Sequence, residues 1–206
     1  MKKIFVVLLL CLMSGKIVAQ EFFGGIVVGG VTSQVEGDTK KGFNKIGFIG
    51  GFFAGLPLNE TFSFQAELRY IQKGSHSDTE EEFYSLKLDY VDVPVFVEAN
   101  LGWVKINDFT LRRISFELGL TFDFLARHSE ETATGYNEGP SPWRKITWNT
   151  LVGVNFKIND SFKIGARMID SINSIRTNVV AGNIRRYFDT WGEFNDILTL
   201  SVYWTL

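Results

Sequence analysis

Two histidines in this sequence stand beside residues that could take part in hydrolytic chemistry. His76 lies between two serines, and His128 is followed by Ser129 and Glu130. A serine nucleophile needs a histidine base and a carboxylate that orients the histidine, but such a triad is defined by geometry and not by adjacency in the sequence. We therefore expect both histidines to be solvated residues of polar loops, and we assign no catalytic residue.

An acidic run and two glycine-rich stretches are the other candidates for a ligand site. The acidic run at residues 78–82 lacks the glycine and the ligand spacing of a calcium loop. It indicates a solvated face, so we assign no metal site. The stretches 24–25 and 47–51 have no helical pattern after them, which a phosphate-binding loop requires. We assign no cofactor, and we expect these glycines to mark bends or close packing.

Segment 113–127 shows the pattern that would position charged side chains. Apolar residues occupy every second position from Ile114 to Ala126, and charged, small or polar residues fill most of the positions between them. Residues two apart share a face in a strand, whereas an α-helix turns by about 100° per residue and would separate them. The segment is longer than a usual strand of about 5–6 residues. It is also long enough to cross a bilayer, for which a tilted strand needs roughly 9–11 residues. We expect its apolar side to face lipid.

Eight segments share this alternation. They are residues 22–32, 45–56, 62–73, 86–100, 113–127, 145–157, 162–168 and 197–206. In segment 86–100 the apolar side changes near Tyr90, which predicts a β-bulge. Pro94 supports an irregularity there because proline cannot donate to a strand ladder.

Short and long connections alternate between the eight segments. The short ones, at 58–62, 106–109 and 158–162, each carry asparagine followed by an acid, a pair that favours turns. The long ones are 33–44, 74–85, 128–144 and 170–195. This asymmetry is typical of outer-membrane barrels, which have short periplasmic turns and long external loops. Because structureless loops above about 15 residues are unusual, we expect 170–195 either to extend strands over the barrel mouth or to be disordered.

The expected fold is therefore all-β, a closed antiparallel up-and-down transmembrane barrel of eight strands. Closure pairs every backbone polar group, as lipid requires, and eight strands leave a lumen that side chains can fill. Because the inward file carries both signs, we expect ion pairs and hydrogen bonds rather than a water channel. The expected interior polar network consists of Gln65, Glu67, Arg69, Glu117, Asp123, Arg127, Lys145, Asn155 and Arg167.

The start of the chain indicates export. Residues 1–19 resemble a cleaved signal peptide, with Lys2 and Lys3 before an apolar core and cleavage after Ala19. Residues 20–206 would then form one barrel domain. The leader contains three of the 21 basic residues and no acid, so 18 basic residues remain against 23 acidic ones. No basic patch is visible, which excludes a nucleic-acid partner. The single cysteine, Cys11, lies in the leader, so no disulfide framework is expected.

Several stretches resemble the PorT-like small outer-membrane β-barrel proteins. They are the glycine-rich first segment, 64–70 followed by Lys73 and Gly74, 88–95, and 116–119. The sequence departs from that pattern at Ala66, where the family often has proline, and in 170–195. The resemblance implies a location in the outer membrane. The named member of the family belongs to a protein-secretion apparatus, and no catalytic residue carries over.

We expect an integral outer-membrane protein without enzymatic activity, with a structural or partner-binding role in the envelope or in a secretion apparatus. Its expected partners are outer-membrane lipid, the barrel-assembly machinery during insertion and a protein that binds the external loops. The chain end, with Trp204 and Leu206 alternating, is similar to the signal that this machinery reads. Two alternatives stay open: a lipid-modifying enzyme, which needs a Ser-His-acid cluster at one rim, and a narrow pore, which needs a continuous lumen.

Overall fold

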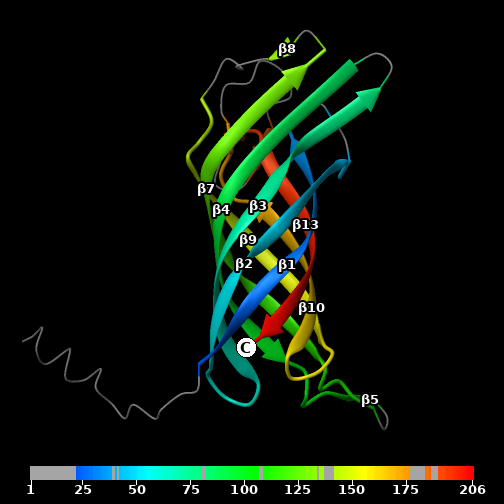
Figure 1. Cartoon of the computed structure of the whole chain (residues 1–206), viewed down its shortest axis with the longest axis vertical. Coiled ribbons are helices and arrows are strands. Elements are labelled where there is room, and N and C mark those ends of the chain that lie inside the picture. The colour runs from blue at the N-terminus through cyan, green and yellow to red at the C-terminus, as the bar shows by residue number, and fades with distance from the viewer. Residues whose placement is uncertain are drawn as a thin grey trace, which may run out of the picture.

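The computed structural model shows antiparallel strands arranged in a ring (Figure 1). It describes residues 22–38, 40, 42–79, 82–106, 109–133, 135–136, 142–176, 184–186 and 190–206. The long strands are β1 (Phe23–Glu36), β2 (Lys45–Pro57), β3 (Phe62–Thr79), β4 (Glu82–Asn100), β7 (Ile114–Thr132), β9 (Ile146–Lys157), β10 (Phe162–Ser171) and β13 (Phe194–Thr205). The short ones are β5 (Lys105–Ile106), β6 (Phe109–Thr110), β8 (Gly135–Tyr136), β11 (Ile184–Arg186) and β12 (Thr190–Gly192).

The ring closes on itself. The order of the long strands is β4-β3-β2-β1-β13-β10-β9-β7, and a further pairing joins β4 to β7. Each long strand therefore has two partners, and the predicted eight-stranded, all-β antiparallel architecture is confirmed. The described residues contain no helix that is long and apolar enough to cross a membrane.

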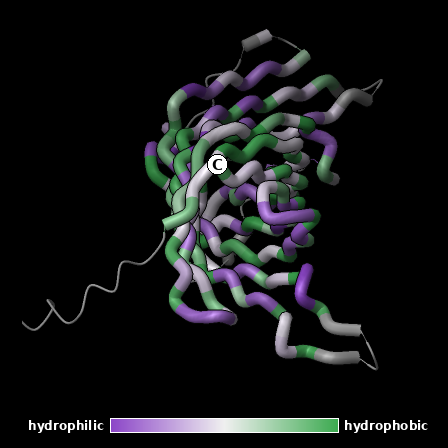
Figure 2. Tube along the Cα trace, turned by 60° about the horizontal axis from the view of Figure 1, so that its bottom comes forward, coloured by the Kyte–Doolittle hydropathy of each residue, from purple (hydrophilic) through white to green (hydrophobic). Residues whose placement is uncertain are grey.

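Apolar side chains point out of the ring, and charged ones point into it. Along β7, Leu118 is 69% exposed while the neighbouring Glu117 is 1% exposed, and Figure 2 shows hydrophobic and hydrophilic positions mixed along each strand. We call the outward apolar surface the apolar band. Its exposed members include Val28, Phe48, Phe52, Phe64, Leu68, Val91, Val97, Phe116, Leu118, Leu120, Phe124, Trp148, Val152, Val154, Ile164, Met168, Leu200 and Val202. A water-soluble protein would have the opposite arrangement.

Aromatic pairs lie toward both ends of the apolar band. Phe162 and Trp204 stack with ring centroids 6.3 Å apart near the short turns. At the other end Phe122 meets Trp148 edge-on at 5.7 Å, on neighbouring strands. Tryptophan is enriched where a bilayer meets water, and these two tryptophans lie toward the two ends of the apolar band, as such interfacial residues do.

Three strands continue far beyond the apolar band, to the top of Figure 1. β3 has 18 residues, and β4 and β7 have 19 each. We call residues 72–79, 82–89 and 126–132 the tower. The prediction that 74–85 and 128–144 are loops is therefore wrong for these parts. Sheet continues there because Leu86 and Leu88 are buried inside while Lys87 between them faces solvent, as in a sheet of a soluble protein.

An apolar core fills the interior at this end of the ring. The buried residues of the cluster are Val31, Val35, Ile49, Ile71, Tyr84, Leu86, Leu88, Tyr90, Phe96, Leu151, Ile169, Ile175 and Ile197. From the charged middle of the ring toward the tower, the interior thus changes from charged to apolar. This change explains why the apolar side of β4 switches near Tyr90, since β4 itself keeps alternating and buries residues 86, 88, 90 and 92 without interruption.

The predicted bulge exists, but its extra residue lies on the partner strand. Asp89 pairs with Arg127 and Tyr90 pairs with Leu125, so Ala126 of β7 has no partner on β4. The alternation of β7 therefore reverses after Ala126. Pro94 has a separate effect, because the β3–β4 ladder is interrupted opposite it.

The short connection between β2 and β3 and the one between β9 and β10 have the same turn structure. The Asn59 side-chain oxygen accepts hydrogen bonds from the amides of Thr61 at 2.9 Å and Phe62 at 2.8 Å. Asn159 repeats this with the amides of Ser161 at 2.9 Å and Phe162 at 2.8 Å. The third predicted turn, at 107–108, lies outside the described residues.

The described parts of 170–195 extend strands over the mouth of the ring. Arg176 forms an isolated antiparallel bridge with Glu193, β11 pairs with β12, and Ile175 is fully buried in the apolar core. These parts follow the strand-extension alternative. Residues 177–183 and 187–189, like the predicted leader and its cleavage site, lie outside the described residues.

Candidate functional site

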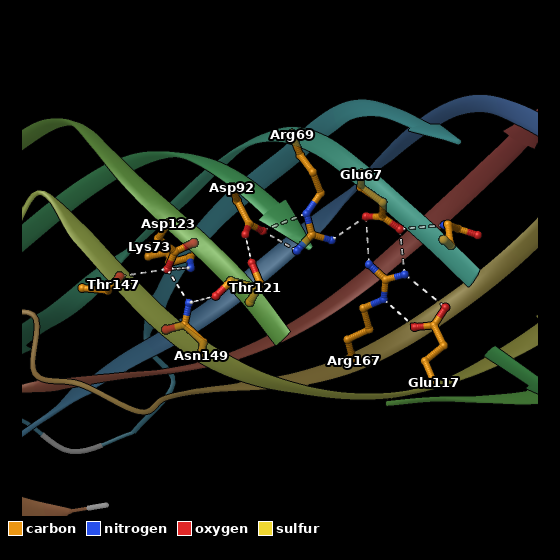
Figure 3. A network of polar contacts seen from close by, with 11 residues as sticks. Glu67, Arg69, Lys73, Asp92, Glu117, Thr121, Asp123, Thr147, Asn149 and Arg167 are labelled. Atoms are coloured by element: carbon orange, nitrogen blue, oxygen red, sulfur yellow. Dashed lines mark hydrogen bonds and ion pairs between the residues drawn. The ribbon is translucent and has the colours of Figure 1, made fainter. Parts of the chain in front are cut away.

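The charged side chains inside the ring form one connected network, centred on Arg167 (Figure 3). Its guanidinium donates to both carboxylate oxygens of Glu67, at 2.9 and 2.8 Å. It also donates to both oxygens of Glu117, at 2.6 and 3.1 Å. The three side chains come from β10, β3 and β7, and each is at most 1% exposed. Arg167 therefore crosses the lumen and neutralises two buried acids.

A second arginine continues the network toward the tower. Arg69 donates to Glu67 at 3.1 Å and to Asp92 at 2.9 and 2.5 Å. The Thr121 hydroxyl donates to the other oxygen of Asp92. Because buried charges persist only when paired and hydrogen-bonded, this arrangement holds β3, β4 and β7 in one register.

A third group of side chains lies between these acids and the apolar core. Lys73 donates to Asp123 at 2.5 Å and lies 5.2 Å from the centre of the Tyr90 ring. Asn149 and Thr147 of β9 donate to the same Asp123 oxygen at 2.8 and 3.3 Å. Every cation named in the interior thus has an acid partner.

Seven of the nine residues expected in the interior network lie inside the ring with buried side chains. They are Gln65, Glu67, Arg69, Glu117, Asp123, Asn155 and Arg167. Gln65 donates to Glu67 at 2.8 Å, and Asn155 donates to Glu117 at 2.5 Å. These contacts join the two amides to the same charged cluster.

Arg127 and Lys145 are exposed instead, so their placement in the interior was wrong. Arg127 follows the bulge at Ala126, which turns it to the outer surface. Lys145 precedes β9, which begins at Ile146, and Thr147 is the first buried residue of that strand. A bulge of one residue, or a strand that begins one residue later, is enough to turn a side chain from the inner face to the outer face.

The sequence analysis missed Lys73 and Asp92 as network members. Lys73 continues the period of two from Arg69 on β3, so the pattern already contained it. Asp92 lies between the outward-facing Val91 and Val93 of β4, so the alternation contained it as well. The ion pair between Lys163 and Glu98, at 2.6 Å, was also missed. It is partly exposed near the short-turn end.

Two glycines provide room for the buried charges. A Cβ at Gly153 would lie 2.6 Å from a Glu117 oxygen and 2.9 Å from Arg167 Cγ. A Cβ at Gly165 would lie 2.3 Å from the Asn155 side-chain oxygen. Both positions face the lumen, and their glycines allow the acidic and amide groups to pack closely.

The two histidines lie on strands of the tower rather than in loops. His76 belongs to β3 and packs edge-on against Phe83 at 6.1 Å. His128 belongs to β7 and lies 6.0 Å from the Trp143 ring. The ring contacts of both histidines are thus with aromatic side chains, and no hydrogen bond described for this part of the chain joins either imidazole to a serine or a carboxylate. No group of three potential metal ligands is found among the described residues either.

A smaller ion-pair cluster closes the mouth of the ring. Arg176 bridges Glu130 of β7 at 2.7 Å and Glu193 at 3.0 Å, and its guanidinium lies 4.1 Å from the centre of the Trp143 ring. The Tyr84 hydroxyl donates to Glu130 at 2.9 Å. Burial raises the pKa of Glu193, and the positive charge of Arg176 opposes this rise. The cluster fastens the segment after β10 to the tower.

Asp38, in the connection after β1, supplies a pH-sensitive group beside this cluster. Burial raises the pKa of Asp38 to about 6, although a hydrogen bond from Ser75 and the backbone amide of Lys40 act to lower it, and the negative charge of Glu193 adds to the rise. Its second carboxylate oxygen is buried without a hydrogen-bond partner. Ionised Asp38 is therefore unfavourable in the folded protein.

We predict that Asp38→Asn stabilises the mouth of the ring at pH 7. The folded state holds the Asp38 proton up to about pH 6, above the ordinary value of 3.8, so this group costs stability as the pH rises through that window. Hydrogen exchange of β1 and β3 amides should be slower in the variant at pH 7 and equal to wild type at pH 4. The matched control is Asp160→Asn, at a fully exposed turn at the other end. Equal exchange of the Asp38 variant and wild type at pH 7 would contradict the prediction.

Comparison with known proteins agrees with this geometry. A family described as outer membrane protein beta-barrel domain matches residues 16–176. The chain belongs to this family. Its apolar band is accordingly the lipid-contacting surface of an outer-membrane β-barrel protein. No curated protein matches the sequence.

Two solved outer-membrane barrels share the fold. The crystal structure of Ail, the attachment invasion locus protein of Yersinia pestis, aligns with a TM-score of 0.51 at 14% identity, covering 90% of this chain and 99% of Ail. Neisserial surface protein A aligns with a TM-score of 0.53 at 12% identity, covering 90% of this chain and 97% of that protein. Identities this low show the common fold of these barrels and nothing about what this β-barrel protein binds.

Proposed function

We propose that this outer-membrane β-barrel protein is a non-enzymatic component of the envelope that binds a protein partner through its tower. The observation that carries the proposal is the length of β3, β4 and β7, since roughly 9–11 residues per strand are enough to cross a bilayer and these strands have 18, 19 and 19. A barrel that only anchored itself in lipid would not need the additional sheet.

The tower has the properties of a binding platform. The pairing of β3 with β4 continues up to the pair Thr79 and Glu82. The pairing of β4 with β7 continues up to the pair Tyr84 and Thr132. Beyond Ile71, β3 has no ladder partner on the β2 side among the described pairings, and the backbone of Gly74 is bonded to the Ser33 hydroxyl, so the open edge lies beyond Gly74. Such an edge presents backbone groups to which a strand of another protein can add. The interior ion pairs hold this platform at a fixed position above the membrane.

The two alternatives have less support. A lipid-modifying enzyme would need a histidine that is hydrogen-bonded to a serine and an acid, whereas the ring contacts described for His76 and His128 are with aromatic side chains. A pore would need a continuous lumen, whereas Arg69 and Arg167 span the interior between acids of several strands. The resemblance to PorT-like proteins extends the proposal to a secretion apparatus as the assembly in which the partner resides.

Site-specific cross-linking in intact cells tests the proposal. A photo-crosslinking amino acid at Ser77, on the tower, should give a discrete adduct with one protein from native envelopes. The same group at Glu60, an exposed turn residue at the opposite end, is the matched control and should not give that adduct. No adduct from Ser77, or the same adduct from Glu60 alone, would contradict binding through the tower.

A further inference from the structure

A recess in the outer wall lies at the base of the tower and is lined by cationic groups. Its volume is about 260 Å³, and Lys45 of β2, Gln72 of β3, Lys87 and Asp89 of β4, and Arg127 and His128 of β7 contribute to its lining. Four neighbouring strands thus bring the cations Lys45, Lys87 and Arg127 and one acid, Asp89, to a single recess. A fourth cation of its lining, Lys73, is paired with Asp123 inside the ring.

The strand register fixes the height of this recess relative to lipid. Gln72 pairs with Asp89, which pairs with Arg127, so these residues form one row around the wall. The next outward row toward the membrane contains Tyr70 and Val91, which belong to the apolar face. Two residues along a strand advance by about 7 Å. The recess therefore lies at the depth of lipid headgroups, directly above their acyl chains.

The cations of the recess lack the partners that the interior cations have. Lys45, Lys87 and Arg127 form no ion pair with a carboxylate among the described residues, whereas Arg69, Lys73 and Arg167 are each paired with buried acids. Burial lowers the pKa of Lys45, the positive charge of Lys87 lowers it further, and Asp89 offsets part of this. Like charges held this close are relieved by an anion between them.

We propose that the recess binds the phosphate group of an anionic lipid in the outer leaflet. Lys45, Lys87 and Arg127 would contact the phosphate oxygens, and the planar guanidinium of Arg127 suits two-point contact with such a group. The acyl chains would run down the apolar face below Tyr70. A juxtamembrane cation is attracted to an anionic lipid surface, so three acting together hold a phosphorylated lipid against exchange. This goes beyond partner binding by the tower and does not depend on it.

The test uses the purified full-length barrel in phosphatidylcholine nanodiscs that contain a small fraction of diphosphorylated lipid A. Retention of lipid A by the protein is measured after exchange into lipid-A-free nanodiscs, for wild type and for Lys45→Gln/Lys87→Gln/Arg127→Gln. The matched control is Arg112→Gln/Arg113→Gln/Lys157→Gln, which removes three exposed cations at the short-turn end. A shift in gel mobility on heating verifies that each variant is folded.

The proposal predicts that wild type and control retain lipid A and that the recess variant retains at least tenfold less. Dephosphorylated lipid A should be retained equally weakly by all three proteins. Equal retention of diphosphorylated lipid A by the folded recess variant and wild type would overturn the proposal. Displacement of the lipid by millimolar inorganic phosphate would also overturn it, because the site would then take a solvent anion without need of the acyl chains.

Discussion

Replacing Arg167 with methionine is expected to cost about 3–5 kcal/mol of unfolding free energy, because removal of one partner leaves buried charges uncompensated. Glu67 and Glu117 each receive two hydrogen bonds from this guanidinium, and both carboxylates are fully buried. In Arg167→Met, Glu117 would retain Asn155 as a hydrogen-bond donor, and Glu67 would retain Gln65 and Arg69. The measurement is urea unfolding of the barrel in phospholipid vesicles.

Two controls separate the lost ion pair from other consequences of this substitution. Lys157→Met removes the cation of an exposed pair with Asp160, and exposed pairs contribute only about 0–1 kcal/mol. In Glu67→Gln/Glu117→Gln/Arg167→Met the charges are removed together, and replacing a complete buried cluster is often close to neutral. Stability of Arg167→Met equal to that of wild type would show that the network is solvated rather than sealed.

Leu120→Arg is expected to cost about 2–4 kcal/mol, because a charge at the bilayer midplane on the lipid face of a barrel is destabilising by that amount. Leu120 is the middle residue of five outward positions of β7, from Phe116 to Phe124. This destabilisation arises because the arginine guanidinium loses its hydration in the hydrocarbon core of the bilayer. The same vesicle unfolding experiment measures this loss.

A depth series provides the control for this substitution. Phe124→Arg lies at the end of the apolar file, where an arginine reaches the interface and the expected cost falls to about 0–1 kcal/mol. In detergent micelles the difference between the two variants should shrink, because a micelle is thinner and more adaptable than a bilayer. Equal losses at Leu120 and Phe124 in vesicles would be inconsistent with the assigned depth.

The eight strands could be predicted from the sequence because each carries a period of two over the length of a bilayer. The bounds of β2, β9 and β10 at their short-turn ends agree within one residue, and Asn59 and Asn159 marked two of the turns. The acids and arginines of the lumen were identifiable because lipid leaves no other place for an alternating charged file. Most of the interior network follows from this argument.

The tower could not be predicted, because alternation shows that a strand has two faces but not which face lies inside. Leu86 and Leu88 face inward while Phe116 and Leu118 face outward, and both files look alike in the sequence. Residues 73–79 of β3 are polar on both faces, which resembles a loop. The bulge at Ala126 could not be recognised in the sequence. Alanine at this position continues the alternating apolar pattern of β7, although the bulge ends that alternation in the structure.

Accessibility of nitroxide labels along β7 tests the central claim that the apolar file contacts lipid and the polar file lines a sealed interior. Single cysteines at 115, 116, 118, 119, 120, 121 and 122 can be labelled specifically, since Cys11 is the only native cysteine and lies in the predicted leader. In vesicles, labels at 116, 118, 120 and 122 should collide with dissolved oxygen and not with a water-soluble nickel chelate, while those at 115, 119 and 121 should collide with neither. Collisions with the chelate at 118 and 120, or an absence of alternation between the two files, would contradict the claim.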